Sequence, residues 1–267
     1  MNFILQTIGG KVTLDMCFQM ERAKEYWDWK NPDDTFKIEY GRLDNFWFNE
    51  LNDLVKLGKF NPEEWCPVGT VEFVEKYIRL FFGNEKADNA MKPLNVPDCF
   101  LEDCRFECGR YIYNRDLSKG NVDEDFSFEE TFFIKDNDRI KNPNNGIMTL
   151  QEAYDKGMRN VQLSTLIKNN SSEWRVFIHN GKAVDVRHYS GSPFEFPDMD
   201  IILDCYVPKL NLMEGTLDVF VDNFNYDTYV DTFVLECHKF FSCGLYGFDN
   251  NDILPLMYWR TYKELIK

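Results

Sequence analysis

The sequence predicts an α+β protein in which antiparallel sheet dominates the second half. In the first half, residues 44–59 and 71–83 place apolar side chains at helical spacing. The second half instead contains short runs of alternating apolar and polar residues separated by turn residues, which is typical of antiparallel strands. Helices and antiparallel strands that are segregated along a chain are the pattern of the α+β class.

The helices of the first half are predicted from end signals as well as from spacing. Asp44 or Asn45 can cap the first helix, because a short polar side chain accepts a hydrogen bond from a free backbone N–H. Gly83 is suited to the end of the second helix. Residues 84–98 contain two prolines among turn-forming residues, so we expect a linker there. Two further helices are expected, at residues 150–158 and 252–267.

The strands of the second half are predicted from its apolar runs, with single strands at residues 131–135 and 160–167. Residues 172–191 form the clearest hairpin, because two alternating strands flank Asn180 and Gly181, which both tolerate the positive φ of a tight turn. A second hairpin is expected from residues 216–223 and 228–236, joined by residues 224–227.

The composition of the chain limits the classes of partner and the cellular compartment that we expect. The chain has 267 residues, of which 44% are hydrophobic, and this is enough for a proper core. Its net charge of −15 argues against a nucleic-acid partner, which needs a basic face. No run approaches the roughly 18 apolar residues of a membrane span, and the N-terminus lacks the basic region of a signal peptide. We therefore expect a cytoplasmic protein without a membrane partner.

Eight cysteines are present, and we expect them to be free thiols, as in a reducing compartment. Cys99, Cys104 and Cys108 lie close in sequence but lack the paired C-x-x-C spacing of a strong zinc site. A zinc-binding interaction module built from these cysteines and a histidine stays a weaker alternative. Cys237 and Cys243 are expected to be small packing residues rather than nucleophiles.

Arg175 and Arg187 lie six residues either side of Gly181. A three-residue loop would set the two arginines directly opposite each other on one face, whereas a strict two-residue loop would pair Arg175 with Val186. Opposed cations repel unless an anion such as a phosphate lies between them. The alternative is a pair of ordinary exposed strand arginines.

Glu236 and His238 are two residues apart at the end of an extended segment, so they face the same side. Together with Asp218 on the neighbouring strand they could hold a divalent ion. Magnesium takes oxygen ligands and bridges to phosphates, so His238 could instead hydrogen-bond a phosphate or orient Glu236. The alternative is a carboxylate at a solvated strand end.

Two blocks of the second half resemble the ATP-grasp superfamily of ATP-dependent carboxylate–amine ligases. The hairpin SEWRVFIHNGKAVDVRHY (172–189) is similar to a segment in which an acidic residue, one spacer and an arginine open a strand that is followed by a turn and a second basic residue. TLDVFVDN (216–223) and VLECHKFFSCGLYG (234–247) are similar to the paired metal-binding strands and the Ser/Gly turn after them. Two arginines with a strand lysine most resemble the clade named for its two arginines and one lysine, found often in phages and bacteria, as does CPVGTVEFVEKYIRLF (66–81).

The resemblance implies an ATP-grasp fold, in which largely antiparallel sheets hold ATP between two subdomains, with an N-terminal α/β domain. Residues 1–110 would form the N-terminal substrate domain and residues 111–267 the ATP-grasp domain. The implied function is an ATP-dependent ligase that uses Mg²⁺ and joins a carboxylate to an amine through an acyl-phosphate, on a small-molecule, peptide or protein substrate. The alternative is a non-catalytic nucleotide-binding protein that acts through a protein partner, in the host cytoplasm if the protein is viral.

The resemblance also implies roles for single cationic residues. Lys135 is similar to the strand lysine that contacts the α- and β-phosphates, although Asp136 follows it where proline is usual. Lys141 is similar to a lysine from a mobile loop that covers the phosphates, with Gly146 as a hinge. The arginines that hold the γ-phosphate and the acyl-phosphate correspond to Arg175 and Arg187, and an N-terminal arginine of the clade corresponds to Arg110.

The nucleotide and metal ligands are carried over in the same way. The adenine-contacting linker matches in part, because Leu163 stands where an acidic residue is expected. Glu173 is similar to a ribose ligand, while Asp218 and Glu236 are similar to the magnesium ligands; His238 replaces the usual asparagine and is a third candidate ligand. Adenine is therefore expected on the backbone of Gln162, Leu163, Ser164 and Thr165.

Overall fold

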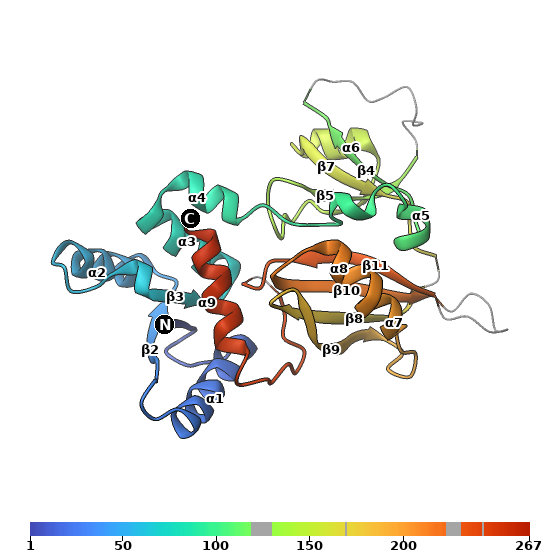
Figure 1. Ribbon diagram of the computed structural model, residues 1–267. Helices are drawn as coiled ribbons and strands as arrows, with labels where there is room; N and C mark the ends of the chain where they lie inside the picture. Colours follow the sequence, from blue (N-terminus) through green and yellow to red (C-terminus); the bar gives the residue numbers. More distant parts are fainter. Residues whose placement is uncertain (119–129, 169, 223–230, 242) are drawn as a thin grey trace. The chain divides into compact units, whose positions relative to one another are not determined.

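The computed structural model of the protein describes residues 1–118, 130–168, 170–222, 231–241 and 243–267 (Figure 1). The chain divides into two compact units, Met1–Ala90 with Lys239–Lys267, and Met91–His238. The sequence placed a single boundary between residues 110 and 111, whereas the C-terminal segment joins the first unit. It does so because its last helix buries Met257 and Tyr258 among the elements of that unit.

The first unit contains a three-stranded parallel sheet of order β2-β1-β3. Strands alternate with helices along the chain, as a parallel sheet requires, because each crossover must return the chain to the same edge. The strands are β1 (Asn2–Thr7), β2 (Lys37–Arg42) and β3 (Trp65–Val68). The helices are α1 (Asp15–Lys30), α2 (Asn45–Lys56), α3 (Val71–Phe82), α4 (Asn84–Ala90) and α9 (Leu254–Leu265), with a 3₁₀ turn at Pro62–Glu64.

Both helices expected in the first half are confirmed, and their ends follow the predicted chemistry. The Asp44 side chain caps α2 by accepting a hydrogen bond from the Trp47 N–H at 2.8 Å. Gly83 follows α3 with a φ of 92°. The expected linker at 84–98 is wrong over its first part, because Asn84–Ala90 form α4, which is anchored by the buried side chains of Ala87 and Ala90.

The second unit contains two four-stranded antiparallel sheets. The larger sheet has the order β11-β10-β8-β9, from β8 (Asn170–His179), β9 (Lys182–Gly191), β10 (Glu214–Asp222) and β11 (Asp231–His238). The smaller sheet has the order β4-β7-β5-β6, from β4 (Ile112–Asp116), β5 (Phe132–Asp136), β6 (Gly146–Met148) and β7 (Asn160–Ser164). Short helical segments complete the unit: α5 (Cys104–Glu107), α6 (Leu150–Asp155), α7 (Met199–Ile201), the π-helical η3 (Ile202–Tyr206), α8 (Val207–Leu210) and a 3₁₀ turn at Asp98–Phe100.

The predicted α+β class and the strands of the second half are confirmed. The hairpin of residues 172–191 is formed by β8 and β9, and β10 and β11 are antiparallel neighbours as expected. The connection between β10 and β11 lies outside the described residues, as does Ser242. The helix expected at 150–158 ends at Asp155, while α9 fills most of 252–267. None of the described helices is long and apolar enough to cross a membrane.

One face of each antiparallel sheet packs on an apolar core. In the larger sheet, Val176 on β8 and Leu217 and Val219 on β10 pack with residues of η3 and α8. In the smaller sheet, Ile134 and Leu163 are fully buried in a core that includes residues of α6. Because side chains alternate along a strand, the residues between them project from the opposite face, and this is where the polar residues gather.

Candidate active site

A row of four charged side chains crosses the larger sheet on the face away from its core. Each strand contributes one residue, and each residue is the directly opposed partner of the next: Glu236 on β11, Asp218 on β10, Arg175 on β8 and Arg187 on β9. Directly opposed residues project from the same face of a sheet. This charged row therefore brings two carboxylates and two guanidinium groups together from positions far apart in sequence.

The pairing of Arg175 with Arg187 arises from a β-bulge and not from a longer loop. The loop has two residues, Asn180 and Gly181, with φ values of 53° and 68°. Between the loop and the arginines, β9 contains one residue more than β8, Val184, which has no partner in the register. A bulge of this kind shifts the register by one residue, so the two-residue loop gives the pairing that a regular hairpin would give only with three residues.

The guanidinium group of Arg175 forms a two-pronged ion pair with Asp218. The Nε–Oδ1 distance is 2.7 Å and the Nη2–Oδ2 distance is 2.6 Å, and both side chains are almost fully buried. Arg187 is about one-third exposed and pairs with Asp185, with an Nε–Oδ2 distance of 2.7 Å. A carboxylate therefore accompanies each arginine in this structure, so their proximity does not by itself require a bound anion.

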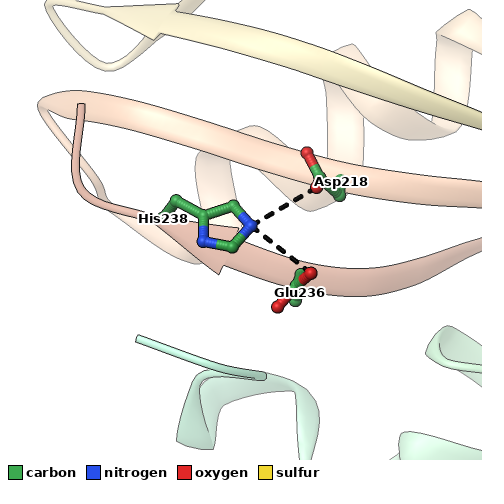
Figure 2. Close-up of side chains that lie close together, drawn as sticks. All are labelled: Asp218, Glu236 and His238. Carbon is green, nitrogen blue, oxygen red and sulfur yellow. Dashed lines mark ion pairs between the residues drawn. The ribbon is translucent and has the colours of Figure 1, made fainter. Parts of the chain in front are cut away.

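Asp218, Glu236 and His238 form a group that can hold a metal ion. One ligand atom from each side chain lies within 4.8 Å of the other two. His238 forms ion pairs with both carboxylates (Figure 2). Its Nε2 is 3.4 Å from the Asp218 Oδ2 and 3.4 Å from the Glu236 Oε1. Two carboxylates fit Mg²⁺, which prefers oxygen ligands and usually keeps several waters.

The electrostatics of this group favour ionised side chains. Burial acts to lower the pKa of His238, but its hydrogen bonds to Asp218 and Glu236 raise that pKa to about 9. Burial also acts to raise the pKa of Glu236, yet His238 and Lys135 hold it well below its usual range. An imidazolium thus lies against the two carboxylates, and it must lose its proton or move before the imidazole could bind a metal ion.

Lys135 on β5 approaches the charged row from the smaller sheet, where its Nζ forms an ion pair with the Glu236 carboxylate. Both side chains line a cavity of about 420 Å³. The residues named from the sequence that line this cavity are Arg110, Lys135, Gln162, Ser164, Thr165, Glu173 and Glu236. The sequence missed Asn170 and the apolar walls, since an apolar residue in or beside a strand is usually a core residue. The apolar walls are Val96, Phe133, Ile147, Leu166, Ile167 and Leu235.

The predicted adenine segment is only partly exposed to this cavity. The Leu163 side chain is fully buried in the core of the smaller sheet and does not line the cavity, so only its backbone is left to contact a base. The Gln162 side-chain amide bonds the backbone of Val96, accepting from its N–H at 3.0 Å and donating to its carbonyl at 2.9 Å. The Thr165 N–H donates to the carbonyl of Tyr111 at 3.0 Å. The Gln162 side chain and the Thr165 N–H thus already form hydrogen bonds to the backbone of neighbouring segments.

Lys141 is exposed in the loop between β5 and β6 and does not line the cavity.

The loop between β5 and β6 is held in shape by Asp136, the residue that stands where the resemblance expects proline. Its carboxylate accepts hydrogen bonds from the Asp138 N–H at 2.7 Å and from the side chain of Asn142. The Asp136 N–H donates to the side chain of Asn145 at 2.9 Å, a bond that proline could not make.

Arg110 lines the cavity from a buried position. Its guanidinium group donates to the carbonyls of Cys108, Val234 and Leu235 at 2.9, 2.9 and 2.8 Å. Burial lowers the pKa of this arginine, while the charge of Glu236 acts in the opposite direction. Arg110 therefore ties the segment before β4 to β11, next to the strand position that carries Glu236.

The zinc alternative finds no support in the described part of the chain. The group of potential ligands found there is the one with Asp218, and it contains no cysteine. Cys104 and Cys108 are buried in the core of the larger sheet, and burial raises the pKa of Cys108 to about 12. Cys237 and Cys243 are also buried, and burial raises the pKa of Cys237 well above its usual value. These cysteines pack as small apolar residues.

Solved structures resemble this chain at low sequence identity. N5-carboxyaminoimidazole synthetase from Staphylococcus aureus, complexed with ADP, matches with a TM-score of 0.50 and 10% identity over 95% of this chain and 76% of that chain. N5-carboxyaminoimidazole ribonucleotide synthetase from Thermotoga maritima matches with a TM-score of 0.50 and 10% identity over 96% and 75%. D-alanine–D-alanine ligase from Bacillus anthracis matches with a TM-score of 0.49 and 12% identity over 99% and 95%.

A search of the curated proteins found no match. At identities this low, the two structures with a TM-score of 0.50 show a shared fold alone. The sequence family is more specific, because residues 108–256 match an ATP-grasp domain, family 2 of the clade named for its two arginines and one lysine. This range is more than half of the 267 residues and includes the whole charged row and Lys135. The chain therefore belongs to the ATP-grasp superfamily, in family 2 of that two-arginine, one-lysine clade.

Proposed function

We propose that this protein is an ATP-dependent ligase that joins a carboxylate to an amine through an acyl-phosphate. The observation that carries the proposal is the charged row beside the cavity, where Lys135 meets Glu236. In such a reaction ATP phosphorylates the carboxylate, and the amine then displaces phosphate from the acyl-phosphate. Positive charge aligned on the transferring phosphoryl group supplies most of the catalysis, and little acid–base apparatus is needed.

The cavity suits a nucleotide in its size and in having both apolar and charged lining residues. Its volume of about 420 Å³ is within the usual range for small-ligand sites. Phe133, Ile147 and Leu166 provide apolar walls for a flat base. The phosphates would lie at Lys135 and Glu236, which both line the cavity, and Glu173 would bond the ribose hydroxyl groups. The adenine contacts would come from the backbone of residues 162–165, and Lys141 would approach the phosphates from its loop.

Asp218 and Glu236 would hold Mg²⁺, with His238 beside them. A divalent ion at this position would bind phosphate oxygens and offset their negative charge. The ion pair between Lys135 and Glu236 would open when phosphate oxygens take the place of the carboxylate as partners of Nζ. The carboxylate would thereby become free to act as a ligand.

The two arginines would have different tasks. Arg175 is buried in its ion pair and holds both carboxylate oxygens of Asp218 in place. Arg187 is about one-third exposed, and its planar donor fork would bind the transferring phosphoryl group. Because the two arginines are directly opposed, any phosphate bound by Arg187 also lies in the field of Arg175.

The test is a measurement of ATP consumption with amino acids, peptides and small carboxylates paired with amines, in which products are identified by mass spectrometry. We expect at least one pair to give ADP together with a condensed product. Glu236→Gln serves as the inactive control. ATP binding without consumption across the panel would instead favour a nucleotide-binding protein that acts through a partner.

A further inference from the structure

The first compact unit has a hollow of its own at the edge where its three parallel strands end. Strand β1 ends at Thr7, β2 at Arg42 and β3 at Val68. The order β2-β1-β3 means that the chain steps to one side of β1 and then crosses to the other. In open α/β sheets, ligands bind beyond the carboxyl ends of the strands at such a reversal. The hollow measures about 820 Å³, and a second one of about 450 Å³ shares Thr7, Gly10 and Arg42 with it.

Gln6 presents an unsatisfied hydrogen-bond donor to this hollow. Gln6 is only 3% exposed, and its Oε1 accepts a hydrogen bond from the Thr70 N–H at 2.7 Å. This bond fixes the orientation of the amide, so Nε2 is the free end. Within the described residues Nε2 has no hydrogen-bond partner, and it keeps some exposure to solvent. A donor that makes no bond to the protein, on a residue that is otherwise buried, is available to a ligand oxygen in the hollow.

The position of Gln6 is built into the surrounding backbone. A Cβ atom at Gly69 would lie 2.5 Å from the Gln6 Oε1 and 2.6 Å from its Cβ, so any larger residue at 69 would displace this side chain. At the neighbouring strand end, a Cβ atom at Gly41 would lie 2.8 Å from ring atoms of Trp47 and Phe73. The amide is therefore held in place before any ligand arrives, as a preorganised site requires.

Charges of both signs line the two hollows. Arg42 is exposed, and its Nε is 3.2 Å from a carboxylate oxygen of Asp44. Glu72 lines the same hollow from the first turn of α3. Glu21, at the adjoining hollow, accepts a hydrogen bond of 2.7 Å from the Tyr40 hydroxyl group. A simple anion would meet the two glutamates as well as Arg42, whereas a ligand that carries both charges can satisfy both sets of groups.

We propose that this hollow binds a free α-amino acid. The α-carboxylate would accept hydrogen bonds from the Gln6 Nε2 and from Arg42, and the α-ammonium group would face Glu72. If the amino acid is the substrate of the ligase reaction, this assignment rests on the proposed function; the binding itself does not require it.

The experiment measures binding of each of the twenty L-α-amino acids to the full chain by ligand-observed NMR and calorimetry, with ATP and metal ions left out. We expect at least one amino acid to bind. Its amide and its des-amino acid each lack one charge, and each should bind at least about tenfold more weakly. Gln6→Met keeps the volume of the side chain but removes the donor, and it should weaken binding by about tenfold. Gln19→Met is the matched control, because Gln19 is also buried but lines neither hollow.

A second pair of variants keeps the test decisive if Gln6→Met fails to fold. Arg42→Gln and Glu72→Gln alter exposed residues and remove one charge each, and both should weaken binding. Lack of binding by every amino acid up to about 10 mM, or equal binding by all variants, would overturn the assignment. Nucleotide binding is measured separately, by comparing the wild type with Lys135→Ala. A failure of amino-acid binding therefore leaves the result for nucleotide binding unaffected, and the reverse also holds. Amino-acid binding without nucleotide binding would contradict the proposed ligase and leave this site standing.

Discussion

Lys135 of β5 and Glu236 of β11 form an ion pair that joins the two antiparallel sheets of the second unit. The same arrangement recurs along the charged row, where Arg175 bonds Asp218 and Arg187 bonds Asp185. His238 lies against both Asp218 and Glu236. Cations and carboxylates of the site thus neutralise one another, so a nucleotide and its metal ion must exchange these pairs for their own contacts.

Lys135→Ala should weaken the binding of a non-hydrolysable ATP analogue by at least about tenfold, because a charged hydrogen bond to phosphate is lost. Calorimetry in the presence of Mg²⁺ measures the affinity. Lys182→Ala is the control, since Lys182 is an exposed lysine at the turn of the β8–β9 hairpin. Equal affinity of Lys135→Ala and the wild type would remove the phosphate role of Lys135.

Glu236→Gln and Asp218→Asn should both abolish ATP turnover but differ in stability. The Glu236 side chain is 22% exposed, so the loss of its charge should lower the free energy of unfolding less than the same change at Asp218 does. The Asp218 side chain is 1% exposed, and its neutral variant leaves the guanidinium group of Arg175 buried without a counter-charge. We expect a loss of about 3 kcal/mol, measured by urea unfolding without metal ions. Full turnover by both variants would show that the metal site is misplaced.

Arg187→Lys should reduce turnover at least about tenfold while ADP affinity changes little, because lysine keeps the charge but loses the planar fork that matches a phosphoryl group. Arg175→Lys should reduce turnover as well, and it should also lower stability because the two-pronged bond to Asp218 is lost. Steady-state turnover and ADP binding are measured in parallel for both variants. If ADP binding falls in step with turnover, the arginines are general nucleotide ligands or structural residues.

His238→Asn should lower the Mg²⁺ concentration at which ATP turnover is half-maximal. In the wild type a cationic imidazolium lies 3.4 Å from each carboxylate, and it competes with a divalent ion for them. Asparagine removes this charge and offers an amide oxygen in its place. A titration of turnover against Mg²⁺ measures the effect. If the variant needs more Mg²⁺ than the wild type, His238 is itself a metal ligand.

Cys205 should be alkylated by iodoacetamide in the native protein much faster than Cys66 or Cys237. Cys205 is exposed, whereas the other two are buried, and burial raises their pKa values well above the usual range. Few thiolates are therefore available at these two positions under mildly alkaline conditions, and the reagent cannot reach them. Peptide mass spectrometry after short labelling measures the order. Fast labelling of Cys237 would indicate a reactive residue in β11 rather than a packing residue.

Local patterns in the sequence predicted α2, α3, α6 and α9 and strands β5 and β7 to β11, but not α1 or the parallel strands β1, β2 and β3. Asp44 and Gly83 mark ends of helices because capping depends on the few residues around a helix end. The alternation in residues 172–191 predicts the hairpin because a strand has a side-chain period of two. The linker expected at 84–98 was wrong at its start, because burial of Ala87 and Ala90 against the first unit stabilises a helix that the turn-forming residues alone would not favour.

The residues of the charged row and Lys135 were also named from the sequence, by their places on strands and by the family resemblance. The sequence could not determine how these residues pair. Whether Arg175 opposes Arg187 depends on a bulge at Val184, and a bulge reflects the packing of a whole strand and leaves no fixed local signal. The apolar walls of the cavity, such as Ile147 and Leu166, were missed for a related reason. An apolar residue gives the same sequence pattern whether its side chain faces a core or a ligand.

The sequence by itself therefore determined the fold class, the family and the chemical types of the site residues, because each depends on residue identity at short spacing. Only the tertiary structure decided which side chains meet: Lys135 with Glu236 across two sheets, Arg175 with Asp218 in a buried pair, and Gln6 with the backbone of Thr70. These contacts join residues from 43 to 101 positions apart. Strand register and sheet packing bring such residues together, and both result from the free energy of the whole unit rather than from any short stretch of the chain.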